Sequence, residues 1–439
     1  MEGERKTLTQ LSVPICLETL FYMLSGMVDT LMLSSVSDQA VGAVGTANTY
    51  IGVFIIMFGV ISSGMVAVMS QNIGAGRPGI AYQARQLGLV FNALTGILMS
   101  VVLAVFSGGI LRAVSIAPAL LESAETYLKI VGGASFLNAL IPIFSSYLRV
   151  FGYTKHSLIG TVVGNVINII LNSVFLFVFN WGVMGVAAAT VFSKVVNLII
   201  VAAMGAVLIK AKQSPERAQP RKILAQIVKI GFPSAFETAL YNVAMTFIVC
   251  FMNHMDTDGM NVTARSYAMQ IANFSYCVGA ALAQANAIMT GWRIGAKKYE
   301  ECDRGTRKAV IYGLVTATCF SVTFAITGRF IVHIFTNDIQ MIELVVKLLV
   351  VDIFLEFGRV TNLVYGQALK TSGDAIFPVI IGAIFMYLFA VGGTYFLGIH
   401  MGLLAVGAYI AMAGDECARA VGMVLRWKSG KWKSKSLVE

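Results

Sequence analysis

Long apolar runs separated by short polar loops dominate the chain. Residues 43–72 hold no charged side chain, and a run of that length exceeds the ~20 residues that a helix needs to cross a bilayer. Hydropathy and turn-forming residues divide the chain into about twelve such runs. The predicted spans cover residues 10–34, 41–71, 84–111, 124–149, 157–180, 183–209, 223–252, 263–292, 308–333, 340–370, 375–397 and 402–426. The pattern therefore predicts an all-α, polytopic membrane protein with twelve transmembrane helices.

The composition supports a membrane protein rather than a soluble one. Apolar residues make up 57% of the chain and charged residues 12%, whereas a soluble protein carries about 25% charged residues. The first apolar run contains Glu18 and Asp29 and has no small-residue cleavage site, so we interpret it as a retained span. The six cysteines and four histidines are dispersed, which supports neither a disulfide framework nor a metal site. We expect no cofactor.

The basic residues fall mainly on alternate loops. With the N-terminus in the cytoplasm, the loop bases assigned to the outer side are Arg112, Lys129, Arg265 and Arg329. This asymmetry follows the positive-inside rule and predicts a multi-pass protein of the cell membrane with both termini in the cytoplasm. The net charge of +10 then faces anionic lipid headgroups, so membrane lipids and not nucleic acid are the expected partners.

Short motifs recur at an offset of about 220 residues, which indicates an internal duplication. The repeated positions are Pro14, Glu18 and Tyr22 with Pro233, Glu237 and Tyr241; residues 73–75 with 294–296; and Leu148, Arg149 and Gly152 with Leu369, Lys370 and Gly373. Each half has an even number of spans, so a pseudo-two-fold axis along the membrane normal is expected to relate them, with a substrate site between them. We predict a six-helix bundle at 1–209, a cytoplasmic linker at 210–222, and a six-helix bundle with a basic cytoplasmic tail at 223–439.

Several motifs in a fixed order resemble those of one transporter family. In the first half they are residues 28–30 (Val-Asp-Thr), residues 71–76 (Gln-Asn-Ile-Gly-Ala-Gly), Asn168 and residues 182–190; in the second half they are Glu356 with Arg359, and Asp415 and Glu416 with Arg419. Over residues 8–426 the chain resembles the multidrug and toxic compound extrusion family, in a bacterial branch. The resemblance implies cation-coupled export of amphiphilic, often cationic organic compounds by alternating access.

The N-terminal half has a carboxylate among amide and hydroxyl oxygens within its predicted spans. Asp29, Asn172 and Thr190 lie at similar depth, roughly 8–12 Å below the outer surface at about 1.5 Å per residue, and Asn168 shares a helix face with Asn172. Because charge at bilayer depth is costly, this group is a candidate site for a proton or Na⁺. The resemblance implies the same role for Asp29, Asn168 and Thr190. Asn172 stands where many members carry a second aspartate, which argues against Na⁺; the alternative is that Asp29 only hydrogen-bonds neighbouring helices.

The C-terminal half carries a second group of charges within its spans. Its members are Glu237, Asp352, Glu356, Arg359, Asp415, Glu416 and Arg419. If all are ionised, five acids and two arginines leave three uncompensated negative charges, so at least one acid is expected to hold a proton. The resemblance implies a coupling role for Glu237, and it places Arg359 where some members carry aspartate, which again argues against Na⁺. The alternative is a static ion-pair network that joins two spans.

Glu18 and Lys194 fall at similar depth in the first and sixth spans, and we interpret them as a structural ion pair. Tyr22, Tyr241 and Phe21 are weaker candidates for contact with flat apolar cations, since most such residues face lipid or neighbouring helices. Residues 74–76 form no phosphate loop, because they follow no strand and lack the Gly-Lys-Ser/Thr sequence. The driving force is therefore expected to be an ion gradient rather than ATP.

Together with the resemblance, these observations predict a monomeric antiporter and not an enzyme. It is expected to export amphiphilic compounds in exchange for protons, with Na⁺ as the alternative coupling ion. One alternative is a flippase for a lipid-linked sugar from the same broad superfamily, which should carry a strongly basic cavity. The bases within the predicted spans are instead few and matched by acids. Another alternative is a membrane-embedded enzyme, which would need a nucleophile–base pair or a metal cluster at one depth. No such group of histidine, cysteine and serine is apparent in the sequence.

Overall fold

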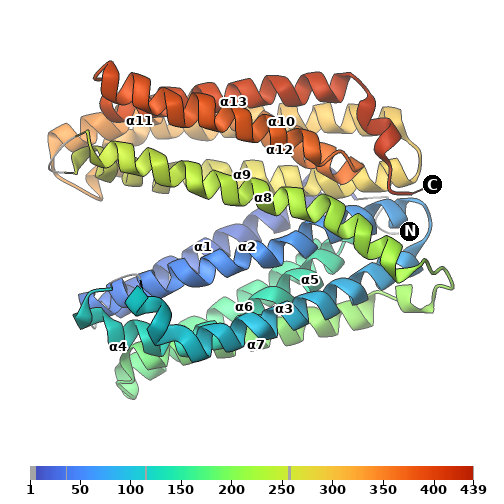
Figure 1. Ribbon diagram of the computed structural model, residues 1–439, viewed down its shortest axis with the longest axis horizontal. Helices are drawn as coiled ribbons and strands as arrows, with labels where there is room; N and C mark the ends of the chain where they lie inside the picture. Colours follow the sequence, from blue (N-terminus) through green and yellow to red (C-terminus); the bar gives the residue numbers. More distant parts are fainter. Residues whose placement is uncertain (1–5, 36, 114–115, 256–258, 439) are drawn as a thin grey trace. The chain divides into compact units, whose positions relative to one another are not determined.

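In the first half of the chain, the described residues form seven α-helices. The computed structural model describes residues 6–35, 37–113, 116–255 and 259–438 (Figure 1), and within these residues no β-strand occurs. The helices of the first half are α1 (Leu8–Ser34), α2 (Asp38–Gly74), α3 (Pro78–Ala113), α4 (Pro118–Tyr127), α5 (Phe136–Val150), α6 (Thr154–Ser173) and α7 (Gly182–Leu208). The π-helical turns η2 (Leu128–Gly132) and η3 (Val174–Val178) extend α4 and α6.

The second half begins after a short 3₁₀ turn, η4 (Ala211–Gln213). Its helices are α8 (Pro220–Asn253), α9 (Met260–Gly295), α10 (Tyr299–His333), α11 (Ile339–Ser372), α12 (Ile376–Phe385) and α13 (Leu404–Lys428). The π-helical segments η5 (Met386–Val391) and η6 (Thr394–His400) continue α12, and the 3₁₀ helix η7 (Lys431–Lys435) follows α13.

The described helices match the twelve predicted spans. Eight segments are long and apolar enough to cross a membrane, and α4 with η2 and α5 form a further span bent by 42°. The other three spans are α9, α11 and α13, of which α11 and α13 carry the charged residues at Glu356 and Glu416. The largest boundary difference is at α10, which starts at Tyr299 rather than at residue 308. Glu300 and Glu301 lie in its first turn, where negative charge stabilises a helix.

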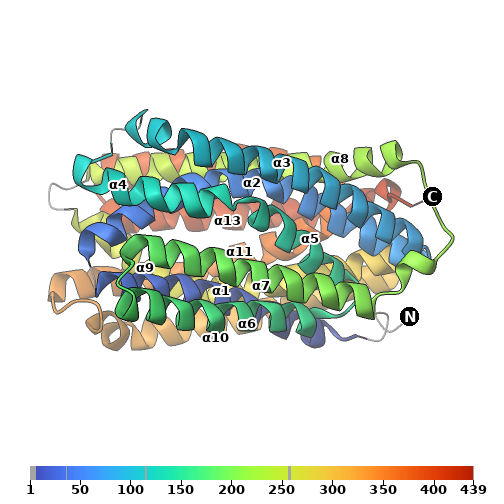
Figure 2. The ribbon, with the colours of Figure 1, turned by 90° about the horizontal axis from the view of Figure 1, so that it is seen from below.

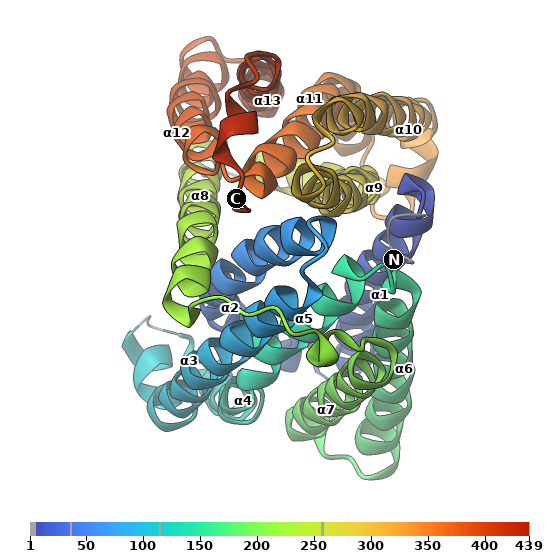
Figure 3. The same ribbon diagram turned by 90° about the vertical axis from the view of Figure 1, so that its right-hand side faces the viewer.

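Each half forms a compact unit of packed helices. One unit contains Leu17–Gly231, and the other contains Thr7–Cys16 and Phe232–Glu439. In the first unit α3 packs against α2 and α5, and α6 runs beside α7 (Figure 2). In the second unit α11 is the central helix and contacts α9, α10 and α13, which Figure 3 views nearly end-on. The axis predicted to relate the two halves remains a prediction.

The boundary between the units differs from the predicted linker, since the start of α8 belongs to the first unit. A Cβ atom on Gly64 would collide with the backbone of Ile227, and one on Gly231 would collide with the backbone of Val60. These two glycines therefore allow α8 and α2 to approach backbone to backbone. The linker is also held to α3, because the side chain of Gln83 donates to the carbonyl of Ala218 at 2.8 Å and accepts from its amide at 3.1 Å.

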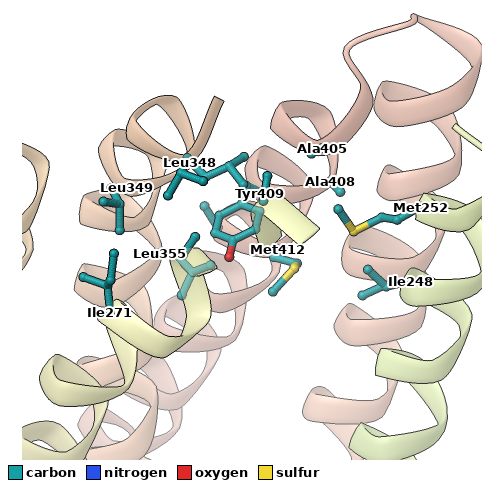
Figure 4. Close-up of a cluster of buried hydrophobic side chains, with 14 of the residues drawn as sticks. Ile248, Met252, Ile271, Leu348, Leu349, Leu355, Ala405, Ala408, Tyr409 and Met412 are labelled. Carbon is teal, nitrogen blue, oxygen red and sulfur yellow. The ribbon is translucent and has the colours of Figure 1, made fainter. Parts of the chain in front are cut away.

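Two apolar clusters lie at opposite ends of the second unit. One is built from residues such as Ile248, Ile271 and Leu348, and it contains Tyr409 on α13 (Figure 4). In this view the hydroxyl of Tyr409 points away from Leu348 and toward the level of Leu355. The other cluster lies at the end near η7 and includes Val364, Met423, Trp427 and Trp432. The charged residues of α11 and α13 fall between these two clusters along the helices.

The basic tail folds back onto the second unit. The indole of Trp432 in η7 is buried and stacks on Trp427 with ring centroids 4.2 Å apart. Its Nε1 donates to the carbonyl of Trp427 at 3.0 Å, and Trp427 Nε1 donates to Asp303 on α10 at 2.8 Å. Gly373, at the end of α11, has no room for a Cβ because the backbone of Lys435 lies against it. The tail is therefore part of the folded unit.

The duplication seen in the sequence extends to unusual backbone geometry. Left-handed residues occur at matching loop positions of the two halves: Gly76 (φ 74°) and Lys297 (φ 59°), Gly152 (86°) and Gly373 (101°), Asn180 (54°) and Gly402 (70°), and Gly182 (53°) and Leu404 (52°). Side chains other than glycine rarely adopt this region. Shared backbone conformations at four loops support one ancestral unit, and Lys297 keeps a conformation that glycine provides in the other copy.

Replacing Lys297 with glycine is expected to stabilise the protein. The side chain of Lys297 is exposed, while its left-handed backbone costs about 1 kcal/mol for a residue with a Cβ. Thermal unfolding of the purified protein in detergent should therefore give a higher melting temperature for Lys297→Gly. The matched control is Gly76→Ala, which meets no atom within 4 Å and should lower the melting temperature. Equal melting temperatures for Lys297→Gly and the wild type would show that the loop relieves this strain elsewhere.

Candidate cation and substrate sites

The first unit contains an open cavity of about 670 Å³ that is lined by both polar and apolar side chains. Three of its walls carry side chains predicted from the sequence: Asp29 on α1, Asn168 on α6, and Thr190 and Lys194 on α7. Tyr127 and Asn48 join them from α4 and α2. The predicted residues thus lie around one cavity, together with Tyr127 and Asn48, which were not predicted.

Asp29 is held by an amide rather than by a base. The Nδ2 of Asn172 donates to Asp29 Oδ1 at 2.6 Å and to Asn168 Oδ1 at 3.3 Å. Asn172 is fully buried, and Asn168 is 3% exposed. The spacing of four residues on α6 puts both amides on one helix face, so α6 presents them to Asp29. The hydroxyl of Thr190 donates to the carbonyl of Val186 at 2.8 Å, so its hydrogen is engaged within α7.

Glu18 pairs with Arg149. The predicted pair of Glu18 with Lys194 is therefore wrong. Arg149 Nη2 lies 2.7 Å from Glu18 Oε1, and the hydroxyl of Ser157 donates to the same oxygen at 3.0 Å. The similar depth of Glu18 and Lys194 did not identify the ion-pair partner, because Arg149 at the end of α5 has a long side chain that reaches into the bundle. Lys194 lines the same cavity without an ion pair among the described residues.

The second unit repeats this ion pair. Lys370 Nζ lies 2.5 Å from Glu237 Oε2, and Glu237 and Lys370 are the residues that match Glu18 and Arg149 in the internal repeat. In both units the acid belongs to the first helix and the base ends the fourth span. The offset of the internal repeat already contained this signal, because Arg149 and Lys370 recur at equivalent positions.

The second unit has its own polar cavity of about 500 Å³, and a network of ion pairs forms one of its walls. Arg359 pairs with Glu356, and Arg419 binds Asp415 through Nε at 3.0 Å and Nη2 at 2.6 Å. Glu416 connects the two arginines, since its Oε1 lies 2.9 Å from Arg419 Nη2 and 3.8 Å from Arg359 Nε. Its other oxygen accepts from Asn362 at 2.9 Å. This network joins α11 to α13.

Fewer negative charges of this cavity are left uncompensated than the sequence predicts. Lys370 neutralises Glu237, and Arg265 of α9 also lines the cavity. With these two bases added, four bases face five acids, which leaves one uncompensated negative charge instead of three. The structure places Arg265 more than a full turn inside α9, where it is 8% exposed. Its predicted position toward the outer side of the membrane remains a prediction.

The aromatic candidates for substrate contact separate into two groups. Tyr22 lines the cavity of the first unit, and Tyr241 lines that of the second. Phe21 is not among the residues of either wall; its carbonyl accepts from Asn165 Nδ2 at 2.8 Å. In the part of the chain that the structure describes, no group of three histidine, cysteine or acidic side chains is placed to hold a metal ion.

Two helical units of one ancestry, each with a polar cavity among membrane-spanning helices, define the chain as a polytopic membrane transporter. The sequence matches the MatE family over residues 14–174 and 233–396. The chain therefore belongs to this family, the one that the sequence motifs resemble, whose members are transporters and not enzymes.

Individual relatives and solved structures agree with this assignment. The chain is 32% identical to YisQ of Bacillus subtilis, an uncharacterized transporter, with 98% of this chain and 96% of the relative covered. It is 27% identical to the probable multidrug resistance protein NorM of Thermotoga maritima, with 99% and 94% covered. An outward-facing multidrug resistance MATE transporter has a TM-score of 0.87 at 18% identity, over 97% of this chain and 96% of that one. A MATE protein in a straight conformation has a TM-score of 0.88 at 19% identity, with the same coverage. These likenesses confirm the predicted all-α, twelve-span fold.

Lys370→Met is expected to destabilise the second unit, because it leaves the carboxylate of Glu237 without its base. Breaking one side of a fully buried pair costs about 3 kcal/mol or more. Lys370 and Glu237 are 13% and 22% exposed, so a smaller but measurable fall in the melting temperature of the purified protein is expected. Adding Glu237→Gln to Lys370→Met should restore much of the loss, since neither charge then remains.

The exposed Lys308 provides a matched control, and Lys308→Met should leave the melting temperature unchanged. If the decreases in melting temperature caused by Lys370→Met and Glu237→Gln simply add in the double variant, the two side chains do not stabilise each other. The repeat-related change Arg149→Met should behave like Lys370→Met.

Proposed function

We propose that this protein exports amphiphilic, often cationic organic compounds across the cell membrane in exchange for protons, by alternating access and as a monomer with both termini in the cytoplasm. Membership in a family with multidrug resistance relatives supports the substrate class. The alternation of basic loops supports the orientation. The single observation that carries the coupling is the environment of Asp29.

Asp29 has the features of a group that takes up and releases a proton. It lines a polar cavity, and its one hydrogen bond to a described side chain comes from the neutral amide of Asn172. An amide donor stabilises the ionised carboxylate but does not neutralise it, unlike the base that pairs with Glu18. A charge at this depth is costly, so protonation from the cavity is a favourable way to remove it.

The surroundings of Asp29 favour a proton over Na⁺. A bare cation needs several oxygens directed at one point, and Asp29 Oδ1 and Asn168 Oδ1 both point at the amide nitrogen of Asn172. That nitrogen carries the partial positive charge of a donor and occupies the place where a cation would bind both oxygens. A proton on the second oxygen of Asp29 requires none of these groups to move.

The network of the second unit is proposed to act mainly as a structural support. Glu237, Glu356, Asp415 and Glu416 each have a base within ion-pair distance. The single uncompensated negative charge keeps a shared proton among these acids as a second coupling candidate. A lipid-linked sugar flippase is disfavoured, because Arg149 and Lys370, two of the cavity bases, are neutralised by Glu18 and Glu237.

Asp29→Asn is expected to abolish gradient-driven export while leaving the fold intact. Asparagine keeps the shape of the side chain and accepts the hydrogen bond from Asn172, but its amide does not take up a proton. Export of a fluorescent organic cation such as ethidium, measured in everted membrane vesicles with an imposed proton gradient, should fall to background. The variant should be present at the wild-type level in the membrane.

The exposed Glu122 of α4 offers a matched control, and Glu122→Gln should export at the wild-type rate. Wild-type export by Asp29→Asn at normal protein level would limit Asp29 to a structural role and transfer the coupling to the acids of the second unit.

A further inference from the structure

The first unit has a second, smaller cavity of about 270 Å³ at the end of the bundle where the linker begins. Its walls come from the ends of α2, α5 and α7, the start of α3 and the linker itself. Most of the wall is apolar, with side chains such as Phe151, Leu208 and Ile209. Among the described residues it shares no side chain with the cavity around Asp29. Neither the proposed export nor the proposed coupling uses this cavity.

The corresponding place in the second unit is filled by an indole of the chain itself. Ile73 of the cavity wall matches Ile294 of the internal repeat. By the same offset, Pro78 at the start of α3 matches Tyr299 at the start of α10. In the second unit, Ile294 belongs to one apolar cluster with Trp432, and the rings of Tyr299 and Trp432 have centroids 6.0 Å apart. Trp432 is 1% exposed, so this place is closed in the second unit.

The two units differ in the short 3₁₀ turn that follows their last span. In the second unit this turn is η7, which carries Trp432 into the apolar cluster. The repeat pairs residues that are 221 or 222 apart, such as Asn180 with Gly402, so Lys210 and Ala211 stand where Trp432 stands. The short side chain of Ala211 lines the open cavity instead. Because an empty apolar space forfeits dispersion contacts, an apolar group from outside the chain is the natural replacement for the indole.

Basic residues accompany this apolar wall. Lys210 lines the cavity, and three exposed bases lie within two residues of other wall positions: Arg77, Lys155 and Lys212. In the linker and the two loops beside the cavity, the one acid is Glu216. It lies against Gly79 with the guanidinium of Arg217 beside it. The occupant should therefore carry an anionic group next to its apolar part.

The position of the cavity along the helices identifies the class of occupant. α2 ends at Gly74, α5 at Val150 and α7 at Leu208, so the cavity lies where the hydrocarbon of the bilayer meets the headgroups. Basic pockets between spans at this level suit acidic lipid headgroups. The volume is below the roughly 300 Å³ at which cavities for drug-sized ligands begin. Part of an acyl chain fits such a space, whereas a whole drug-sized compound does not.

We propose that this cavity binds an anionic phospholipid, with an acyl chain in the place that Trp432 fills in the second unit and its phosphate on Lys210 and Lys212. The choice of the inner leaflet rests on the proposed orientation of the chain. Because the linker forms part of the wall, the bound lipid holds the linker against the first bundle. Binding requires neither transport nor a proton gradient, so its failure is distinguishable from a failure of the proposed function.

The test counts lipid molecules on the purified full-length protein by native mass spectrometry. Dioleoylphosphatidylglycerol should bind at one site more tightly than dioleoylphosphatidylcholine, whose headgroup carries no net charge. Lys210→Gln combined with Lys212→Gln should weaken this site for phosphatidylglycerol by about tenfold or more, as expected for lost charge-assisted hydrogen bonds. It should leave phosphatidylcholine unchanged. The matched control is Lys431→Gln with Lys433→Gln, which removes two exposed lysines of η7 and should alter neither affinity.

A second variant copies the side chain that closes the corresponding place. Ala211→Trp should remove the site for both lipids and raise the melting temperature, because the indole then fills the cavity. If Ala211→Trp does not fold, the lysine variants still decide the question. An unchanged affinity for phosphatidylglycerol in the variant of Lys210 and Lys212, or an equal loss in the η7 control, would overturn the proposal. Displacement of the lipid by millimolar inorganic phosphate would also overturn it, since the site would then recognise phosphate without an acyl chain.

Discussion

Compensation of charge inside each helical unit is the constraint on which the rest of the structure depends. Carboxylates among membrane-spanning helices are stable only when a base, a strong donor or a proton offsets them. Glu18 with Arg149 ties α1 to α5, and Glu237 with Lys370 ties α8 to α11. The network around Glu416 joins α11 to α13 in the same way. These pairs fix which helices lie together, because a shift of either partner would leave an uncompensated charge.

The proposed coupling rests on a side chain that escapes this compensation. Asp29 has a neutral amide where Glu18 has an arginine, so its charge is free to be removed by a proton. Arg265 and Asp352 face one cavity without partners among the described residues. The two copies of the ancestral unit have therefore kept the same structural ion pair and diverged elsewhere. The first copy is proposed to exchange a proton through Asp29.

The sequence was sufficient to predict the twelve spans and the duplication, since both depend on hydropathy and on short motifs that survive in each half. The ion-pair partners were harder to predict. Depth along the chain suggested Lys194 for Glu18, but helix rotation and the reach of a long side chain decide the partner, and these select Arg149. The burial of Arg265 was also not predicted, because the count of bases by side does not show which of them α9 buries. The repeat contained the missing information, because Arg149 and Lys370 recur at equivalent positions beside Glu18 and Glu237.

Proton-coupled export is the central claim, and proton movement in proteoliposomes tests it most directly. Purified protein would be reconstituted with a pH-sensitive dye trapped inside, in buffer free of sodium, and a gradient of an organic cation would then be imposed. The account predicts that substrate moving in one direction drives protons in the other, and that Asp29→Asn vesicles show no such pH change. A pH change that is absent from wild-type vesicles without sodium, with substrate movement restored by added Na⁺, would contradict it.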